Sequence, residues 1–198
     1  GRLSPLDRVF LYGGGGFETL RSYNKEPFQL EDHVPRRSHS ARYFDIPFRY
    51  TTRQIRPIIE QLLTLNDCRD AYIRMTLSRG FGTHGLIPAD TCTPTFVIHA
   101  KPFVNYSASS YKTGISLITS GLRRSTTCPI SSHKTLNYLT NYLIKKEAVE
   151  KGVHDAIILN TNNYYSHLTA FLEQMIGQNF MNDSHRKIWT IVNIPLEI

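Results

Sequence analysis

Hydrophobic and polar residues alternate along several short segments of this chain, and a period of two predicts β-strands. Residues 17–23 form one such segment, in which Phe17 and Thr19 share a side. Residues 72–78 form another, in which Ile73 and Met75 lie on the side opposite Arg74. Further strands are predicted at residues 28–30, 95–100, 114–119 and 155–160, with residues 164–168 as the return strand of a hairpin.

Two segments instead place apolar residues three or four positions apart, which predicts helices. The first runs from residue 31 or 32 to about residue 44. Arg37 interrupts its apolar face at a position where a leucine is expected. The second begins at Thr51 or Thr52 as its N-cap and ends near Asn66. Its apolar face consists of Ile55, Ile58, Ile59, Leu62 and Leu63.

A third helix is predicted close behind Lys134. Ser131 or Ser132 caps it, and Gly152 ends it. Its apolar face consists of Leu136, Leu139, Leu143 and Ala148. Lys134 is then expected at the helix entrance, where a side chain can point into a dry site. Burial disfavours the charged form of a lysine, and a neutral amine forms Schiff bases with carbonyl groups. On residue type alone, an ordinary surface lysine is the alternative.

Four consecutive glycines, Gly13 to Gly16, precede the first predicted strand. A glycine run can cradle a phosphate, but here no Lys-Ser/Thr pair and no helix follow it. We therefore favour a tight turn or bulge where the backbone comes close to another group, because glycine permits such approaches.

The composition bounds the size and class of the protein. Its 198 residues suffice for one large domain or two small ones, and 40% hydrophobic residues will build a core. No apolar run is long enough to span a bilayer. No signal peptide is visible, although the sequence opens with Gly1 rather than Met, which leaves room for a preceding segment. Cys68, Cys92 and Cys128 are far apart and show no CxxC or zinc spacing, so we expect a reducing, cytoplasmic compartment and no metal.

The net charge of +7 is compatible with an anionic partner. The arginines are spread along the chain, however, and the longest basic pieces are pairs such as Arg36-Arg37. Because no nucleic-acid-binding motif is present, we expect neither a nucleic acid nor a membrane as partner. A small phosphorylated or carboxylated molecule would also use several arginines, each as a bidentate fork.

Three blocks of the sequence share one order and spacing with a known enzyme family. The first block is Asp7-Arg8, Phe10 to Gly13, Gly15, Phe17 to Arg21, His33, Arg36 and Ser40-Ala41. The second is Tyr72 to Arg74, Ser78 to Gly80 and Gly82. The third is His133 to Leu139, Glu147-Ala148, Gly152 and Asp155 to Ile157. Together they resemble fold-type IV pyridoxal-phosphate enzymes: branched-chain and D-amino-acid aminotransferases and 4-amino-4-deoxychorismate lyase.

The resemblance implies roles for particular residues. Lys134 would hold pyridoxal 5'-phosphate as a Schiff base and then move a proton to and from the substrate α-carbon. Arg36 would grip the cofactor phosphate, and Tyr138 would bond its phenolic oxygen. The residues at substrate-lining positions are Phe17, Arg21, Arg74 and Arg79.

The sequence departs from the family at its C-terminal end. Where the family has a glutamate that pairs with the pyridine nitrogen, this chain has His167, although Thr169 still matches. A neutral imidazole can accept a hydrogen bond there but cannot offer a carboxylate's charge. From Phe171 onward the resemblance stops.

The predicted architecture is therefore a two-domain α/β (α+β) fold of this family. Residues 1–104 form a small N-terminal domain of a sheet and helices, and residues 105–112 form a linker. Residues 113–198 form an incomplete larger domain that carries Lys134. By resemblance, the protein is a homodimer.

Three functions remain open at this stage. The first is an aminotransferase that acts on an amino acid and a 2-oxo acid, and the glycine and proline pattern after Arg79 favours it. The second is the lyase, which uses the same lysine but eliminates pyruvate. The third is a catalytically impaired family member that only dimerises or binds a ligand.

Overall fold

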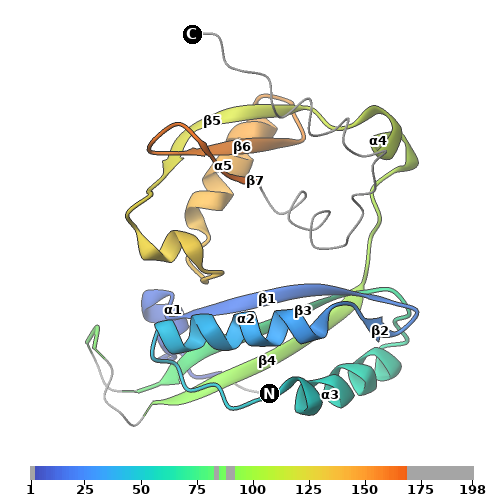
Figure 1. Cartoon of the computed structure of the whole chain (residues 1–198), viewed down its shortest axis with the longest axis vertical. Coiled ribbons are helices and arrows are strands. Elements are labelled where there is room, and N and C mark those ends of the chain that lie inside the picture. The colour runs from blue at the N-terminus through green and yellow to red at the C-terminus, as the bar shows by residue number, and fades with distance from the viewer. Residues whose placement is uncertain (1–2, 83–84, 88–91, 169–198) are drawn as a thin grey trace. The chain divides into compact units, whose positions relative to one another are not determined.

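The computed structural model describes residues 3–82, 85–87 and 92–168, which form two compact units (Figure 1). The first unit comprises the described residues within 1–104 and 129–138. The second comprises those within 105–128 and 139–198. One division between the units thus falls after Val104, and residues 129–138 group with the first unit.

A four-stranded antiparallel sheet forms the centre of the first unit. Its order is β2 (Glu26–Pro27), β1 (Gly15–Tyr23), β3 (Ala71–Phe81) and β4 (Thr93–Pro102). The predicted alternation of β3 is confirmed, because Ile73, Met75 and Leu77 are buried while Arg74 is only partly so. Residues 28–30 were expected as a strand, but Gln29 has a φ of 50°, a left-handed conformation that cannot continue one.

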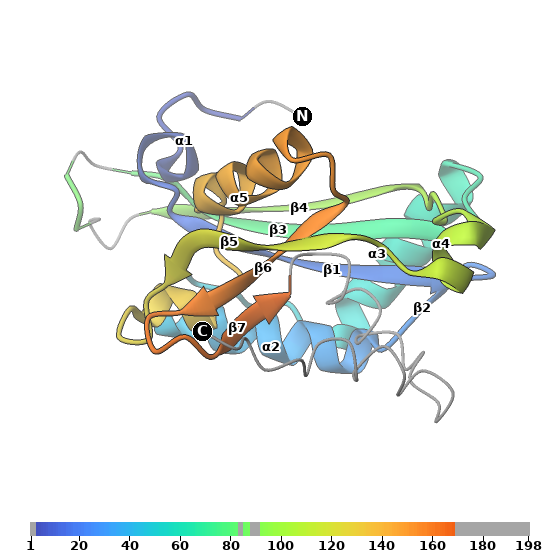
Figure 2. The same cartoon turned by 90° about the horizontal axis from the view of Figure 1, so that it is seen from above.

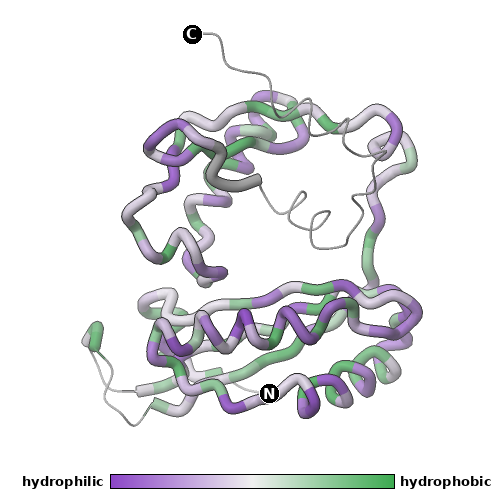
Figure 3. Tube along the Cα trace, viewed as in Figure 1, coloured by the Kyte–Doolittle hydropathy of each residue, from purple (hydrophilic) through white to green (hydrophobic). Residues whose placement is uncertain are grey.

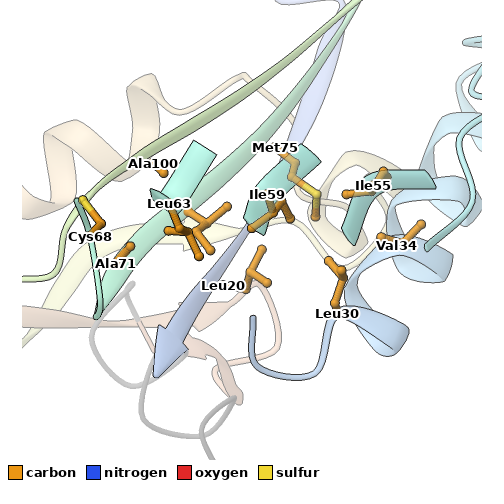
Figure 4. Close-up of a cluster of buried hydrophobic side chains, with 11 residues drawn as sticks. Leu20, Leu30, Val34, Ile55, Ile59, Leu63, Cys68, Ala71, Met75 and Ala100 are labelled. Carbon is orange, nitrogen blue, oxygen red and sulfur yellow. The ribbon is translucent and has the colours of Figure 1, made fainter. Parts of the chain in front are cut away.

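Two long helices pack on the same side of this sheet (Figures 1 and 2). They are α2 (Leu30–Tyr43) and α3 (Thr52–Leu65), and a short helix, α1 (Arg8–Tyr12), precedes β1. The buried cluster between helices and sheet consists of Leu20, Leu30, Val34, Ile55, Ile59, Leu63, Cys68, Ala71, Ile73, Met75 and Ala100 (Figure 4). Hydrophilic residues recur along α2 (Figure 3), and most of its buried residues lie on the side that faces the sheet.

The start of α3 confirms the predicted cap. The Thr51 side chain accepts a hydrogen bond from the Gln54 backbone, and the Gln54 side chain accepts one in return from the Thr51 N–H, which forms a capping box. The buried stripe is narrower than predicted, because Ile58 is 44% exposed. Positions four apart, Ile55 and Ile59, lie directly against the sheet.

The second unit contains a three-stranded sheet in the order β5-β6-β7. β5 (Leu117–Arg124) and β6 (Asp155–Asn160) are parallel and are joined through α5 (Leu139–Glu150), whereas β7 (Tyr165–Leu168) returns antiparallel. The small core consists of Ile144, Ala148, Ala156 and Ile158. β5 begins three residues later than predicted, and the expected linker overlaps α4 (Ala108–Thr113).

The segment around Lys134 corrects the third predicted helix. Residues Pro129–Ser132 form a single 3₁₀ turn, and α5 begins only at Leu139, so Lys134 lies five residues ahead of the helix. Leu139 is 72% and Leu143 46% exposed, while Ile144 and Ala148 are buried. The reason is a pairing with β1 that draws residues 134–136 out of the helix.

Among the described residues, no helix combines the length and apolar character needed to cross a membrane. The same residues contain no group of three side chains suited to holding a metal ion. Cys68, Cys92 and Cys128 are free thiols, and Cys68 is buried in the core of the first unit.

Candidate active site

Backbone hydrogen bonds fix the segment that carries Lys134 to the edge of β1. Phe17 N–H donates to Lys134 O over 2.9 Å, and Leu136 N–H donates to Gly15 O over 3.1 Å. The edge is available there because β2 pairs with β1 only at Ser22 and Tyr23. The backbone of Lys134 is therefore fixed to the edge of β1.

The glycine run makes this approach sterically feasible. A Cβ on Gly16 would lie 2.5 Å from Lys134 O, and a Cβ on Gly15 would lie 2.5 Å from Leu77 O. Real Cβ atoms do not come that close to a carbonyl oxygen. The predicted close approach of the backbone at Gly13 to Gly16 is thus confirmed.

Three predicted site residues lie around the aromatic ring of a fourth, Phe17. Lys134 Nζ lies 5.8 Å from the Phe17 ring centroid. The Arg74 guanidinium carbon lies 3.7 Å from the same centroid, and the Tyr138 ring meets it edge-on at 5.0 Å. An amine, a guanidinium and a phenol therefore surround an apolar platform, which can orient a substrate that has one charged and one apolar end.

The other two predicted substrate arginines have different neighbours. The Arg21 guanidinium carbon lies 4.0 Å from the Phe103 ring centroid, and its buried Nε has no hydrogen-bond partner among the described residues. Arg79 donates from Nη1 to Asp45 O over 3.0 Å and from Nη2 to Phe44 O. Arg79 thus holds the C-terminal end of α2 rather than joining the group around Phe17.

On the opposite face of β1, Glu18 is the centre of a cationic cluster. Its carboxylate is nearly buried and accepts from Arg36 Nε over 2.9 Å and Arg36 Nη2 over 2.5 Å. His33 Nδ1 lies 3.1 Å from the second carboxylate oxygen. Burial raises the pKa of Glu18, but the hydrogen bonds from His33 and Arg36 outweigh it and hold the pKa below its ordinary value.

Arg37, one residue further along α2, is 1% exposed. Its Nε and Nη2 have no hydrogen-bond partner among the described residues. Burial lowers the pKa of Arg37 to about 10, against the opposing effect of Glu18, so the guanidinium stays charged at neutral pH. A polar row follows from these contacts, and we call it the α2 seam: His33, Arg37 and Ser40 of α2 with Glu18, Gly16 and His133 opposite them.

His133 closes the α2 seam beside Lys134. Its Nδ1 lies 3.1 Å from Ser40 Oγ, and its ring stacks 6.0 Å from that of His39. Burial lowers the pKa of His133, and the nearby His39 and Arg37 lower it further. The imidazole is therefore neutral at pH 7.

Comparison with known proteins shows which family this chain belongs to. A sequence profile described as amino-transferase class IV matches residues 15–170. The chain belongs to the class IV aminotransferase family. This confirms the resemblance inferred from the three sequence blocks and the fold class expected from them.

Individual relatives cover both activities of the class IV aminotransferase family. The aminodeoxychorismate lyase of Bacillus subtilis is 32% identical over 73% of this chain and 49% of its own length. The crystal structure of the Escherichia coli branched-chain amino acid aminotransferase has a TM-score of 0.77 at 25% identity, over 83% of this chain and 57% of that one. A T.th. branched-chain amino acid aminotransferase with pyridoxamine 5'-phosphate has a TM-score of 0.75 at 27% identity, over 83% and 56%. The chain spans about half the length of the curated relatives it matches.

Two residues assigned from the class IV pattern lie at the limit of the structure. His167 is in β7, where its backbone pairs with Ile158 of β6. Thr169 lies outside the described residues. Their proposed contacts with a cofactor remain predictions.

Sequence reasoning assigned a functional role to no member of the α2 seam, including the charged Glu18 and Arg37. The signal was present in the spacing, because His33, Arg37 and Ser40 are four and three residues apart and so share one face of a helix. Arg37 was noted only as an interruption of the apolar face, and His33, Ser40 and His133 only as members of the family-like blocks. A polar stripe on a buried helix face indicates a site more directly than any one of its residues.

Proposed function

We propose that this protein is a pyridoxal-phosphate-dependent aminotransferase that moves an amino group between an amino acid and a 2-oxo acid. The observation that carries the proposal is the placement of Lys134, whose backbone is fixed to β1 and whose amine lies near the Phe17 ring that Arg74 and Tyr138 also contact. Class IV membership supports it. A cytoplasmic homodimer belongs to the same proposal, and light scattering of the purified protein tests the dimer.

The residues present suit this cofactor. Lys134 offers a primary amine for its aldehyde, and Arg36 and the unmatched donors of Arg37 suit a phosphate group. When bound, the cofactor supplies a ring that accepts the electron pair left at the substrate α-carbon. Tyr138 offers a hydroxyl for its phenolic oxygen. We propose this set as the cofactor-binding residues of the first unit.

Lys134 has two tasks in this mechanism. Its amine would hold the aldehyde carbon of the cofactor and, once the substrate amine replaces it there, would move the proton from the substrate α-carbon to that same cofactor carbon. A side chain on a fixed backbone suits both tasks, because the amine moves between two positions while its attachment stays in place. Arg74 would bind the substrate carboxylate, and Phe17 would cover the apolar part of the substrate.

The test is covalent labelling. Incubation with pyridoxal phosphate should give visible absorbance, and borohydride should then leave a pyridoxyl group on the peptide containing Lys134. Lys134→Ala should lose the label and the turnover, while the free energy of unfolding changes little. A label on Lys145 or Lys146, which lie on exposed turns of α5, would contradict the assignment.

The lyase activity is the second candidate, favoured by the likeness to the Bacillus subtilis aminodeoxychorismate lyase. Both reactions use one amine as covalent anchor and proton carrier, so the residues around Phe17 serve either. Pyruvate release from aminodeoxychorismate, measured beside amino transfer from glutamate to 2-oxo acids, separates them. A chain that takes the label at Lys134 but performs neither reaction is the catalytically impaired alternative.

A further inference from the structure

The α2 seam contains a charged group whose hydrogen-bonding capacity is unmet. Arg37 is buried, yet its Nε and Nη2 have no hydrogen-bond partner among the described residues. Burying the N–H donors of a charged side chain without hydrogen-bond acceptors strongly destabilises the folded state. Native proteins rarely leave such groups unmatched, and a bound anion can supply the acceptors that the protein itself does not.

The two unmatched atoms define the shape of the missing acceptor. Nε–H and Nη2–H form one edge of the planar guanidinium, the fork that binds two oxygens of a phosphate or carboxylate at once. Arg36 already uses this same edge on both oxygens of Glu18. Glu18 is thus satisfied by Arg36 and His33, whereas the Arg37 edge remains open.

The position of Arg37 links the α2 seam to Lys134. Arg37 Nη1 and Lys134 O each lie 2.5 Å from the point where a Gly16 Cβ would be. The guanidinium and the backbone carbonyl of the residue that would anchor the cofactor therefore lie beside the same point of β1. The side chain of Arg36 is 53% exposed, and His133 is only partly buried. Solvent therefore reaches the α2 seam beside Arg37.

The charges of the seam favour an anion. Arg37 within the seam and Arg36 beside it contribute two positive charges against the single negative charge of Glu18, with His133 neutral. A phosphate monoester brings two negative charges and several acceptor oxygens, and it would balance this excess.

We propose that Arg37 binds the cofactor phosphate through its Nε–Nη2 edge, as a second guanidinium beside Arg36. This rests on the proposed function, because it takes the ligand to be pyridoxal phosphate. Free inorganic phosphate has the same chemistry and provides an independent test of the site.

The experiment compares pyridoxal phosphate with pyridoxal, which lacks the phosphate, by absorbance titration. Arg37→Leu should weaken binding of pyridoxal phosphate by about ten- to a hundredfold, as expected for a hydrogen-bonded charged group. Binding of pyridoxal should stay within about twofold. Leucine suits the fold, because it is the residue that the apolar face of α2 leads one to expect. The control Arg42→Leu removes a charge from an exposed position of α2 and should change neither affinity.

Two outcomes of the absorbance titration overturn the proposal. Equal weakening of both ligands by Arg37→Leu would show that Arg37 only supports the fold, and no weakening of either would show that it touches no phosphate. If wild type binds neither ligand, the proposed function fails, and inorganic phosphate then decides about Arg37. A phosphate-dependent rise in melting temperature that Arg37→Leu abolishes and Arg42→Leu retains supports the anion site, and no rise in wild type refutes it.

Discussion

Gly16 is the residue at which two distant parts of the first unit come into contact. Gly16→Ala places a Cβ against Lys134 O and Arg37 Nη1, and the carbonyl cannot move without breaking its bond to Phe17. We expect a loss of about 1–3 kcal/mol in the free energy of unfolding, measured by urea titration. Labelling at Lys134 should weaken with it.

Gly121 provides the matched control, because a Cβ there meets no heavy atom within 4 Å. Gly121→Ala should change the free energy of unfolding by no more than about 0.5 kcal/mol. Equal losses from the two substitutions would mean that the close approach at Gly16 is not what the chain requires there.

His133 makes stability depend on pH in a defined direction. Its folded pKa lies below the ordinary value of 6.5, so between the two values the unfolded chain binds more protons than the folded one. The contribution is fully present above pH 6.5 and is lost as the pH falls toward the folded pKa. His133→Gln should reduce the drop in unfolding free energy between about pH 7.5 and about pH 5.5. An undiminished drop would assign the effect to other groups.

Single residues also show which structural features the sequence alone can predict and which it cannot. Ile73 and Met75 were predictable as core because their alternation is a local property. The burial of Arg37 was not predictable from its sequence neighbours, because its guanidinium lies in the space beside Gly16, which lacks a side chain. An arginine at a position where leucine is expected showed only that the apolar face of the helix was interrupted there.

At the scale of elements, the sequence predicted an end of a helix correctly where residues close in sequence form that end. The start of α3 is specified by Thr51 and Gln54, which are three residues apart. Thr51→Ala removes the acceptor for the Gln54 N–H and should lower the free energy of unfolding by about 1 kcal/mol. Arg53→Ala, an exposed neighbour in the first turn, is the control and should have little effect in the same urea titration.

Elements whose ends depend on a distant partner were misjudged. Leu136 fits a helical pattern with Leu139, yet its N–H bonds to Gly15 O in an extended segment. The pairing with β1 outweighs the helical preference of this segment. The sequence of residues 129–138 alone gives no sign of that pairing. The same reason explains why Lys134 was assigned to the second domain.

At the scale of the whole molecule, the first unit holds the lysine and the second holds His167 in β7. The resemblance noted in the sequence implies a glutamate at the position of His167. Because a carboxylate would support the protonated ring nitrogen better than an imidazole does, His167→Glu should raise amino transfer by about tenfold or more, which is about 1.4 kcal/mol of barrier. Initial rates at saturating cofactor measure this. Efficient turnover by the unmodified chain would show that another residue serves the nitrogen.

The fixing of Lys134 to β1 also sets an order of events during folding. The chain completes the strands within residues 1–104, continues through residues 105–128, and only then returns with the segment that pairs with Gly15 and Phe17. Closing so long a loop is entropically costly and slow compared with forming neighbouring strands. During synthesis from the N-terminus, the sheet can therefore be in place before the reactive amine reaches it, and the capacity to take up an aldehyde should be one of the last properties that the first unit acquires.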